Sequence, residues 1–227
     1  MTSVFYRADA IKSNHKGTRN YLSSKSCAAS TLDDDGKEMI SNTIVAAIKE
    51  GMTANTHITA LSDGAKNCWR IVDALKPLCQ EVTSILDWFH ISMKMENISL
   101  PEAIKPKFLR IKWHLWRGNV SSALIRLSEL KFITTEEKVI KKLSQFITYI
   151  ENNKGKIVNY RERKELGLVF TSNLAESTVE SLINQRCKGQ QHMKWSREGL
   201  DPILQLRAQI HSAAWNAKWK TAVLTAL

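Results

Sequence analysis

Two acidic residues stand where separate elements of the fold are expected to meet. Asp63 directly follows a strand-like segment, and Glu176 lies near the start of a late helical segment. Phosphoryl transfer to DNA by a two-metal route needs carboxylates from separate elements, which hold two Mg²⁺ (or Mn²⁺) ions about 3.5 to 4 Å apart. That chemistry is one interpretation of the pair. A turn or a helix cap is the commoner use of an Asp-Gly pair that follows a strand.

The elements around Asp63 predict an α/β sheet. Residues 56–62 alternate as a strand does, residues 67–78 have helical periodicity, and residues 82–86 form a second strand that runs into Asp87. Acidic residues that follow successive strands are typical of α/β sheets, which place functional groups at the carboxyl ends of their strands.

Helical periodicity dominates most of the remaining chain. From Trp88 to Asn153 it predicts about three to five helices, with breaks at Pro101, Pro106, Gly118-Asn119 and Thr134-Thr135, the last acting as a helix cap. We also expect helices at Lys37–Lys49, from a Ser172-Asn173 cap to about Arg186, and from a Ser196 cap to Gln209. Two weak strands, around 4–6 and 21–29, are expected before the acidic turn at 33–36.

The charge of the chain favours a polyanionic partner. Lys and Arg number 33 against 22 Asp and Glu, which gives a formal net charge of +11. The longest apolar stretches are far shorter than the roughly 20 residues of a bilayer span, and the amino terminus lacks the design of a secretory signal. We therefore expect no membrane partner and a cytoplasmic location. The four cysteines have no metal-ligand spacing and are expected to be ordinary free thiols.

Several motifs, in order along the chain, resemble those of DDE transposases of bacterial insertion sequences in the ISKra group, which are relatives of the Mutator-like elements. The resemblance covers roughly residues 51–210. It is carried by Ser62-Asp63-Gly64-Ala65, Ile85-Leu86-Asp87-Trp88-Phe89-His90-Ile91, Leu115-Trp116-Arg117-Gly118-Asn119, Tyr149-Ile150-Glu151-Asn152-Asn153, Asn159-Tyr160-Arg161-Glu162-Arg163, Ala175-Glu176-Ser177-Thr178-Val179, Gln185 to Ser196 and Leu204-Gln205-Leu206-Arg207.

The resemblance implies roles for particular residues. Asp63 would be the second metal-binding carboxylate and Glu176 the third, with Glu180, one helical turn later, as the alternative. Asp87 and His90 fall on an Asp/Cys-x-x-His motif that would position the active site or nearby DNA. For His90, metal ligation and a buried structural role both stay open.

The resemblance also implies a fold, a domain order and a partner. The fold would be a ribonuclease-H-like α/β core interrupted by an all-α insertion. Residues 1–91 would form the first part of the core, residues 92–165 the insertion, and residues 166–227 the part that carries Glu176. The partner would be double-stranded DNA, as transposon ends and target, with a homo-oligomer or a full-length transposase as a protein partner.

Basic residues gather after the Glu176 helix. Their position predicts phosphate contacts, with the Trp195 indole stacked on an exposed base; a solvated loop with a core tryptophan is the alternative. The cluster consists of Arg186, Lys188, Lys194, Trp195 and Arg197, and a second basic run, at 161–164, extends it. The tryptophan pairs Trp113/Trp116 and Trp215/Trp219 have the spacing of helix packing.

The family's first catalytic aspartate has no clear counterpart here. Asp9 is the only acidic residue before the run at 33–35, and its surroundings do not match an apolar strand followed by Asp-Gly. We expect a chain truncated at its amino terminus and inactive alone. Two alternatives remain: a non-catalytic DNA-binding remnant, and a basic helical scaffold that binds RNA or protein.

Overall fold

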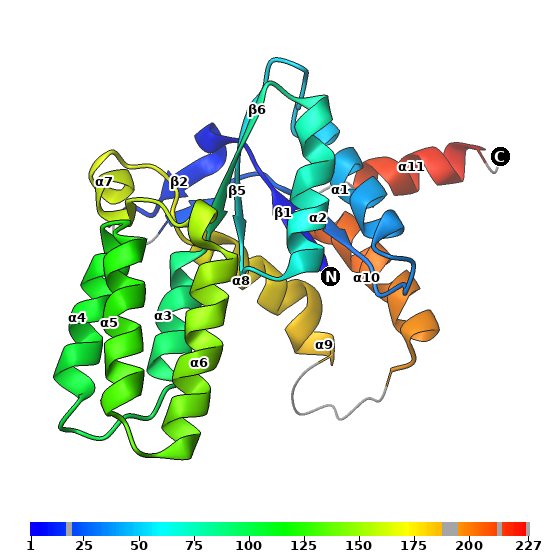
Figure 1. Cartoon of the computed structure of the whole chain (residues 1–227). Helices are drawn as coiled ribbons and strands as arrows, with labels where there is room; N and C mark the ends of the chain where they lie inside the picture. The colour runs from blue at the N-terminus through cyan, green and yellow to red at the C-terminus, as the bar shows by residue number, and fades with distance from the viewer. Residues whose placement is uncertain (17–19, 188–194, 213–214, 226–227) are drawn as a thin grey trace. The chain divides into compact units, whose positions relative to one another are not determined.

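The computed structural model describes residues 1–16, 20–187, 195–212 and 215–225 as a mixture of helices and short strands (Figure 1). The mixed α/β class predicted from the sequence is confirmed. The chain forms two compact units, each described here by itself. Unit 1 consists of Met1–His57, Arg70–Val82 and Asn173–Leu227, and unit 2 consists of Ile58–Trp69 and Thr83–Ser172.

Unit 1 begins with two antiparallel strand pairs. β1 (Thr2–Phe5) pairs with β4 (Ser26–Ala29), and β2 (Ile11–Ser13) pairs with β3 (Asn20–Leu22). A short 3-10 turn, η1 (Ala8–Ala10), separates β1 from β2. Only two strands were predicted here, because elements of three or four residues are too short to show an alternating pattern.

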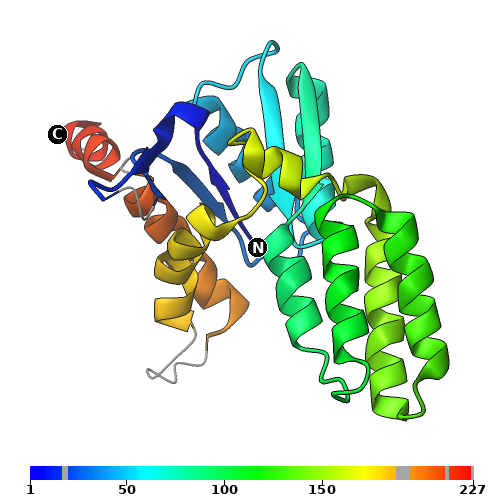
Figure 2. The ribbon, with the colours of Figure 1, turned by 90° about the vertical axis from the view of Figure 1, so that its left-hand side faces the viewer.

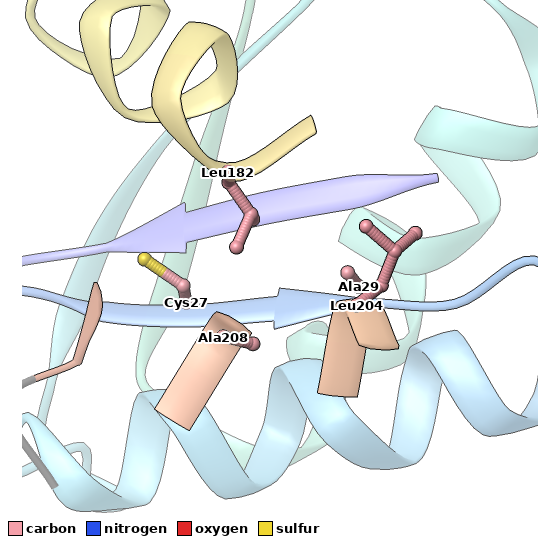
Figure 3. Packing of buried hydrophobic residues seen from close by; sticks show 5 residues of the cluster. All are labelled: Cys27, Ala29, Leu182, Leu204 and Ala208. Atoms are coloured by element: carbon pink, nitrogen blue, oxygen red, sulfur yellow. The ribbon is translucent and has the colours of Figure 1, made fainter. Parts of the chain in front are cut away.

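Strand β4 is buried on both faces. Successive residues of a strand point to opposite faces, and the small side chains of β4 allow helices to approach closely on each. Helices α1 (Lys37–Lys49) and α10 (Arg197–His211) pack against β4. One face of β4 contributes to a cluster of Cys27, Ala29, Leu182, Leu204 and Ala208 (Figure 3). The other face contributes to a cluster of Ala28, Met39, Ala46 and Ile71.

The helices of unit 1 agree with the sequence in part. α1 has the predicted bounds, and the Asp34 carboxylate accepts hydrogen bonds from the main-chain N–H groups of Gly36 (2.9 Å) and Glu38 (2.7 Å) at its start. The Ser196 hydroxyl caps α10 as predicted. The predicted helix from 173 to about 186 is present, and its middle part is π-helical. It consists of α8 (Asn173–Val179), the π-helical η4 (Glu180–Asn184) and α9 (Gln185–Cys187), and α11 (Trp215–Thr225) follows α10.

A strand, a helix and a second strand follow α1 in the predicted order: β5 (His57–Ser62), α2 (Lys66–Leu75) with a 3-10 extension η2 (Lys76–Leu78), and β6 (Glu81–Leu86). β5 pairs with β6. The Gln80 N–H donates to the Thr56 carbonyl at one end (3.0 Å), and the Asp87 N–H donates to the Ser62 carbonyl at the other (2.8 Å). The two strands are therefore parallel, and Asp63 and Asp87 follow them at the same end.

Helices make up most of unit 2, and Figures 1 and 2 show α4, α5 and α6 side by side. The helices are α3 (Trp88–Glu96), α4 (Lys105–Trp116), α5 (Val120–Ile133), α6 (Glu137–Asn152), the 3-10 turn η3 (Lys154–Lys156) and α7 (Tyr160–Glu165). None of the described helices combines the length and apolar character needed to cross a bilayer.

Two predictions about the ends of these helices were wrong. Pro106 does not separate two helices. It lies in the first turn of α4, where the missing N–H of proline costs no helical hydrogen bond. Thr134 does not cap α6, since its hydroxyl group donates to the Leu130 carbonyl at the end of α5 (2.7 Å). The residue before α6 is Glu136.

Candidate active site at the ends of two parallel strands

Asp63 lies in the turn between β5 and α2, and it is half-buried. Its Oδ1 atom accepts hydrogen bonds from the Ala65 N–H (2.9 Å) and the Ser62 hydroxyl (3.4 Å). Asp63 therefore does form the turn that was the alternative to metal ligation, and it uses Oδ1 of its carboxylate to do so.

Gly64 allows helix α6 to approach this turn closely. Its φ of +94° lies in the left-handed region, and a Cβ atom added there would lie 2.8 Å from Tyr149 Cε2 and 2.9 Å from both Asn153 Nδ2 and Leu86 Cδ1. The Tyr149 hydroxyl donates to the Asp63 carbonyl at 2.8 Å. A side chain at position 64 would push α6 away from the Asp63 turn.

A buried polar chain continues from α6 to α2. The Trp69 indole N–H donates to Asn153 Oδ1 (2.8 Å), and Asn153 Nδ2 donates to the Tyr149 carbonyl (2.9 Å). Asn153 is only 2% exposed, so its amide would be costly to leave without these partners. The network therefore fixes Trp69, the end of α6 and the Asp63 turn relative to one another within unit 2.

Asp87 is the most buried acidic residue near these strand ends, with 1% exposure. Its Oδ2 atom lies 2.6 Å from His90 Nδ1 and 2.6 Å from the Ser172 hydroxyl, which donates to it. Its Oδ1 atom accepts from the main-chain N–H groups of Ser172 (2.9 Å) and Phe89 (3.2 Å). The carboxylate thus caps α3, holds the His90 ring, whose side chain is 23% exposed, and anchors the segment at Ser172.

The electrostatics of this region favour an ionised Asp87. Burial alone would raise the pKa of Asp87, but the hydrogen bonds from His90 and Ser172 outweigh it and lower the pKa below its ordinary value. Burial and the negative charges of Asp63 and Asp87 raise the pKa of Tyr149, so its phenol stays protonated and donates. Burial and the adjacent Asp63 raise the pKa of the Cys68 thiol to about 11. The Asp63 and Asp87 carboxylates therefore both act on the Tyr149 phenol.

Glu176 lies on α8 in unit 1, where it is half-buried. On the same helix, Thr178 is buried, and its hydroxyl accepts a hydrogen bond from Lys25 Nζ at 2.7 Å. Glu180, the alternative ligand, is exposed at the start of the π-helical turn, where Asn184 Nδ2 donates to it at 2.5 Å. Within unit 2, Asp63, Asp87 and His90 lie at the same end of the β5–β6 pair. A metal site shared by Asp63 and Glu176 stays a prediction.

The predicted basic cluster is described only in part. Lys188 and Lys194 lie outside the described residues, as does the side chain of Arg186. Trp195 is half-buried just before α10, and Arg197, the first residue of α10, pairs with Asp33 at 2.7 Å while both side chains stay exposed. Asp9, the early acidic residue, is exposed and pairs with Arg7 at 3.1 Å.

The tryptophan pairs only partly follow the packing role that their spacing predicted. Trp116 belongs to an aromatic cluster, with its ring centroid 4.7 Å from that of Trp88 and 6.0 Å from that of Tyr160. Trp113 was predicted wrongly, because it is 59% exposed. Trp215 and Trp219 stack at 5.6 Å, yet Trp219 is also 59% exposed. Helical spacing brings such rings to one face but does not determine what covers that face.

The sequence patterns indicated no role for Tyr149 or Asn153, and they indicated a different role for Ser172. The signal for the first two was present, since both belong to a motif that the resemblance singled out. Ser172 was interpreted as a helix cap, although its hydroxyl donates to Asp87. Within the ranges that the structure describes, no three His, Cys, Asp or Glu side chains gather closely enough to hold a metal ion by themselves.

A family model matches residues 12–221, and its description is an uncharacterised protein family, UPF0236. Because the match covers most of the chain, the protein belongs to that family. No curated protein and no solved structure matches the chain.

Proposed function

We propose that this member of UPF0236 is a DNA transposase of the acidic-triad type, or a derivative of one. In it, Asp63 and Glu176 hold Mg²⁺ or Mn²⁺ for phosphodiester hydrolysis and strand transfer on double-stranded DNA. The observation that supports the proposal most directly is the parallel β5–β6 pair, from which Asp63 and Asp87 emerge at the same end. Phosphoryl-transfer sites of α/β proteins are built at such strand ends.

The same proposal includes a fold. Residues 1–91 and 166–227 would form a ribonuclease-H-like core, and residues 92–165 an inserted helical domain. Its support is the run of helices α4, α5 and α6 after the second strand, before the chain returns to Ser172 and α8. An insertion of this kind would leave the two carboxylates far apart in sequence but on one core.

The covalent chain itself limits how far Glu176 can lie from the strand ends. Ser172 is hydrogen-bonded to Asp87 through both its hydroxyl and its N–H group. Glu176 follows Ser172 by four residues, and even a fully extended chain of that length spans no more than about 14 Å. This tether supports a role for Glu176 beside the strand ends.

The donor set fits a hard divalent cation. Mg²⁺ prefers carboxylate oxygens, which Asp63 and Glu176 would supply together with water and DNA phosphate. When bound, the metal would activate water and then a DNA 3′-hydroxyl group for attack on a phosphodiester. Asp87 holds the Nδ1 side of the His90 ring, so that its role is to orient His90 and the Ser172 segment rather than to bind metal.

Iron-mediated cleavage of the polypeptide tests the metal site without requiring catalysis. Fe²⁺ would replace Mg²⁺, and ascorbate with peroxide would generate radicals at the bound ion. We expect cuts near residues 63 and 176 that excess Mg²⁺ suppresses and that Asp63→Asn or Glu176→Gln abolishes. Asp73→Asn, which changes an exposed carboxylate in an ion pair with Lys76, is the matched control and should leave the cuts intact. Absence of cuts at both places contradicts the proposal.

A second candidate function is DNA binding without catalysis, which the formal charge of +11 favours. Such a protein would occupy transposon ends or join a homo-oligomer or a full-length transposase without cutting. Nicking of an end-containing duplex with Mg²⁺ or Mn²⁺ distinguishes the two candidates. Metal-dependent nicking lost in Asp63→Asn supports the enzyme, and binding without nicking supports the second candidate.

A further inference from the structure

A cleft of about 420 Å³ lies in unit 2, between the end of α4 and α7. Two indole rings and three cationic side chains line it together with one carboxylate: Trp113, Trp116, Arg117, Arg161, Lys164 and Glu165. Its volume falls within the range of small-ligand sites. The cleft therefore combines flat aromatic rings with positive charge.

The walls of the cleft are fixed by buried contacts. Tyr160, the first residue of α7, is fully buried, and its hydroxyl group donates to the Leu86 carbonyl at 2.7 Å. Its ring stacks on that of Trp116. At the end of α4, Gly118 has a φ of +74°, and a Cβ atom there would lie 3.1 Å from the main-chain nitrogen of Asn159, just before α7. The end of α4 and the start of α7 therefore lie in direct contact, so that the main chain carrying the lining residues is held in place.

The side chains at the cleft differ in how firmly they are held. Trp116 is held in the aromatic cluster, whereas Trp113, one helical turn earlier, is 59% exposed. Arg161 Nε donates to Glu165 Oε1 at 2.8 Å, which orients a guanidinium group that has further N–H donors. Arg117 and Lys164 are exposed. With three cations against one carboxylate, the lining carries a net positive charge.

We propose that this cleft binds an unpaired nucleotide of single-stranded DNA, with the base stacked on the Trp113 indole and the adjoining phosphates on Arg117, Arg161 and Lys164. Stacking on an aromatic ring requires an exposed base face, which a paired base inside a duplex does not offer. Cationic side chains beside the ring suit the phosphates on either side of that base. The choice of DNA rests on the proposed function, but the cleft does not depend on a metal at Asp63.

The test measures the binding of fluorescein-labelled (dT)12 to the full chain by anisotropy, in EDTA and about 0.15 M salt. Trp113→Ala is expected to weaken binding by about 5- to 100-fold, the range found when a stacking residue is removed. Phe132→Ala, which removes another exposed ring of unit 2 outside the cleft, is the matched control and should change nothing. Photocrosslinking of a strand that contains 5-iododeoxyuridine should label the peptide that carries Trp113.

Charge variants test the phosphate contacts separately. Lys164→Ala should weaken binding and make the slope of log K against log salt shallower by about 0.7, the value for one phosphate contact to a single strand. Arg126→Ala removes an exposed cation of α5 outside the cleft and should leave that slope unchanged. Glu165→Gln should tighten binding, because it removes the carboxylate from the lining.

Three results would overturn the inference. The first is equal affinity of Trp113→Ala and Phe132→Ala. The second is that a 12-base-pair duplex competes as well as unlabelled (dT)12 for the protein, which would mean that no unpaired base is recognised. The third is that thymidine monophosphate competes as well as the strand at equal concentration, which would make a free nucleotide the ligand. Because EDTA is present, loss of metal-dependent cutting affects only the proposed function, and loss of (dT)12 binding affects only the cleft.

Discussion

The Ser172 hydroxyl group donates a hydrogen bond of 2.6 Å to Oδ2 of Asp87, between residues 85 positions apart in the chain. The same oxygen atom lies 2.6 Å from His90 Nδ1. One buried carboxylate therefore connects the end of a strand, the first turn of a helix and the segment that leads into α8. Such a residue is expected to stabilise the fold as well as to orient its neighbours.

Replacement of this carboxylate by an amide gives the first prediction. Asp87→Asn should lower the free energy of unfolding by about 3 kcal/mol at pH 7, because buried donors lose a charged acceptor. The exposed Asp73→Asn should cost less than about 0.5 kcal/mol, since Asp73 forms only a surface ion pair with Lys76. Urea unfolding measures both values, and equal stability of Asp87→Asn and the wild type would refute the role given to Asp87.

The second prediction concerns pH. Folding lowers the pKa of Asp87, so its contribution to stability is fully present above the unfolded value of about 4. That contribution is lost as the pH falls through the lower, folded value. The stability difference between the wild type and Asp87→Asn should therefore shrink as the pH falls below about pH 4. A difference that grows below about pH 4 would contradict the direction of this pKa shift.

The third prediction concerns Gly64. Gly64→Ala should destabilise the protein by at least about 2 kcal/mol, because the new methyl group would overlap Tyr149, Asn153 and Leu86 and φ is positive. Gly167 provides the comparison, since it also has a positive φ but no atom within 4 Å of a Cβ. Gly167→Ala should cost only the conformational strain, about 1 kcal/mol. Thermal or urea unfolding of both variants separates overlap from strain.

The fourth prediction uses the Cys68 thiol as a probe of the charge on Asp63. Its pKa, raised to about 11 by burial and by Asp63, should make alkylation by iodoacetamide slow at pH 8.5. Asp63→Asn removes the negative charge and should accelerate the reaction of Cys68 several-fold. The Cys79 peptide is the internal control, since burial is the main cause of its raised pKa. Mass spectrometry of the peptides gives both rates, and an unchanged Cys68 rate would show that Asp63 does not act on it.

The last prediction tests the attachment of α7 to β6. Tyr160→Phe removes the donor to the Leu86 carbonyl and should cost about 1–3 kcal/mol, because a buried acceptor loses its partner. Tyr21→Phe, at a tyrosine that is 51% exposed, should be neutral. Denaturant unfolding compares the two variants. A neutral Tyr160→Phe would mean that the aromatic contacts of Tyr160 alone hold α7.

Local patterns were sufficient to predict the elements that repeat over several turns or alternations. The bounds of α1 and the order β5, α2, β6 followed from apolar spacing, because each element contains enough residues to show its own period. Asp63 could likewise be placed at a strand end. The π-helical geometry of Glu180–Asn184 could not be predicted, because this segment has the same apolar spacing as the helical turns around it.

Contacts between distant segments account for what the sequence did not reveal. A serine before a helix is usually a cap, and nothing near Ser172 indicates a partner 85 residues away. Trp113 and Trp116 share one helical face, but their different exposures depend on where α7 lies. Neighbours contributed by other elements determine whether such a side chain is structural or accessible to a ligand.

The division of the chain into two units bears on how the protein emerges from the ribosome. Residues 1–57 are synthesised before Ile58–Ser172, yet β4 packs against α10 and Leu182, which belong to the Asn173–Leu227 stretch of unit 1. All of Ile58–Ser172 is synthesised before that stretch. During translation, unit 2 is therefore complete while Cys27 and Ala29 of β4 still lack the contacts that Leu182 and α10 later provide, which leaves an apolar surface open to aggregation or to a chaperone.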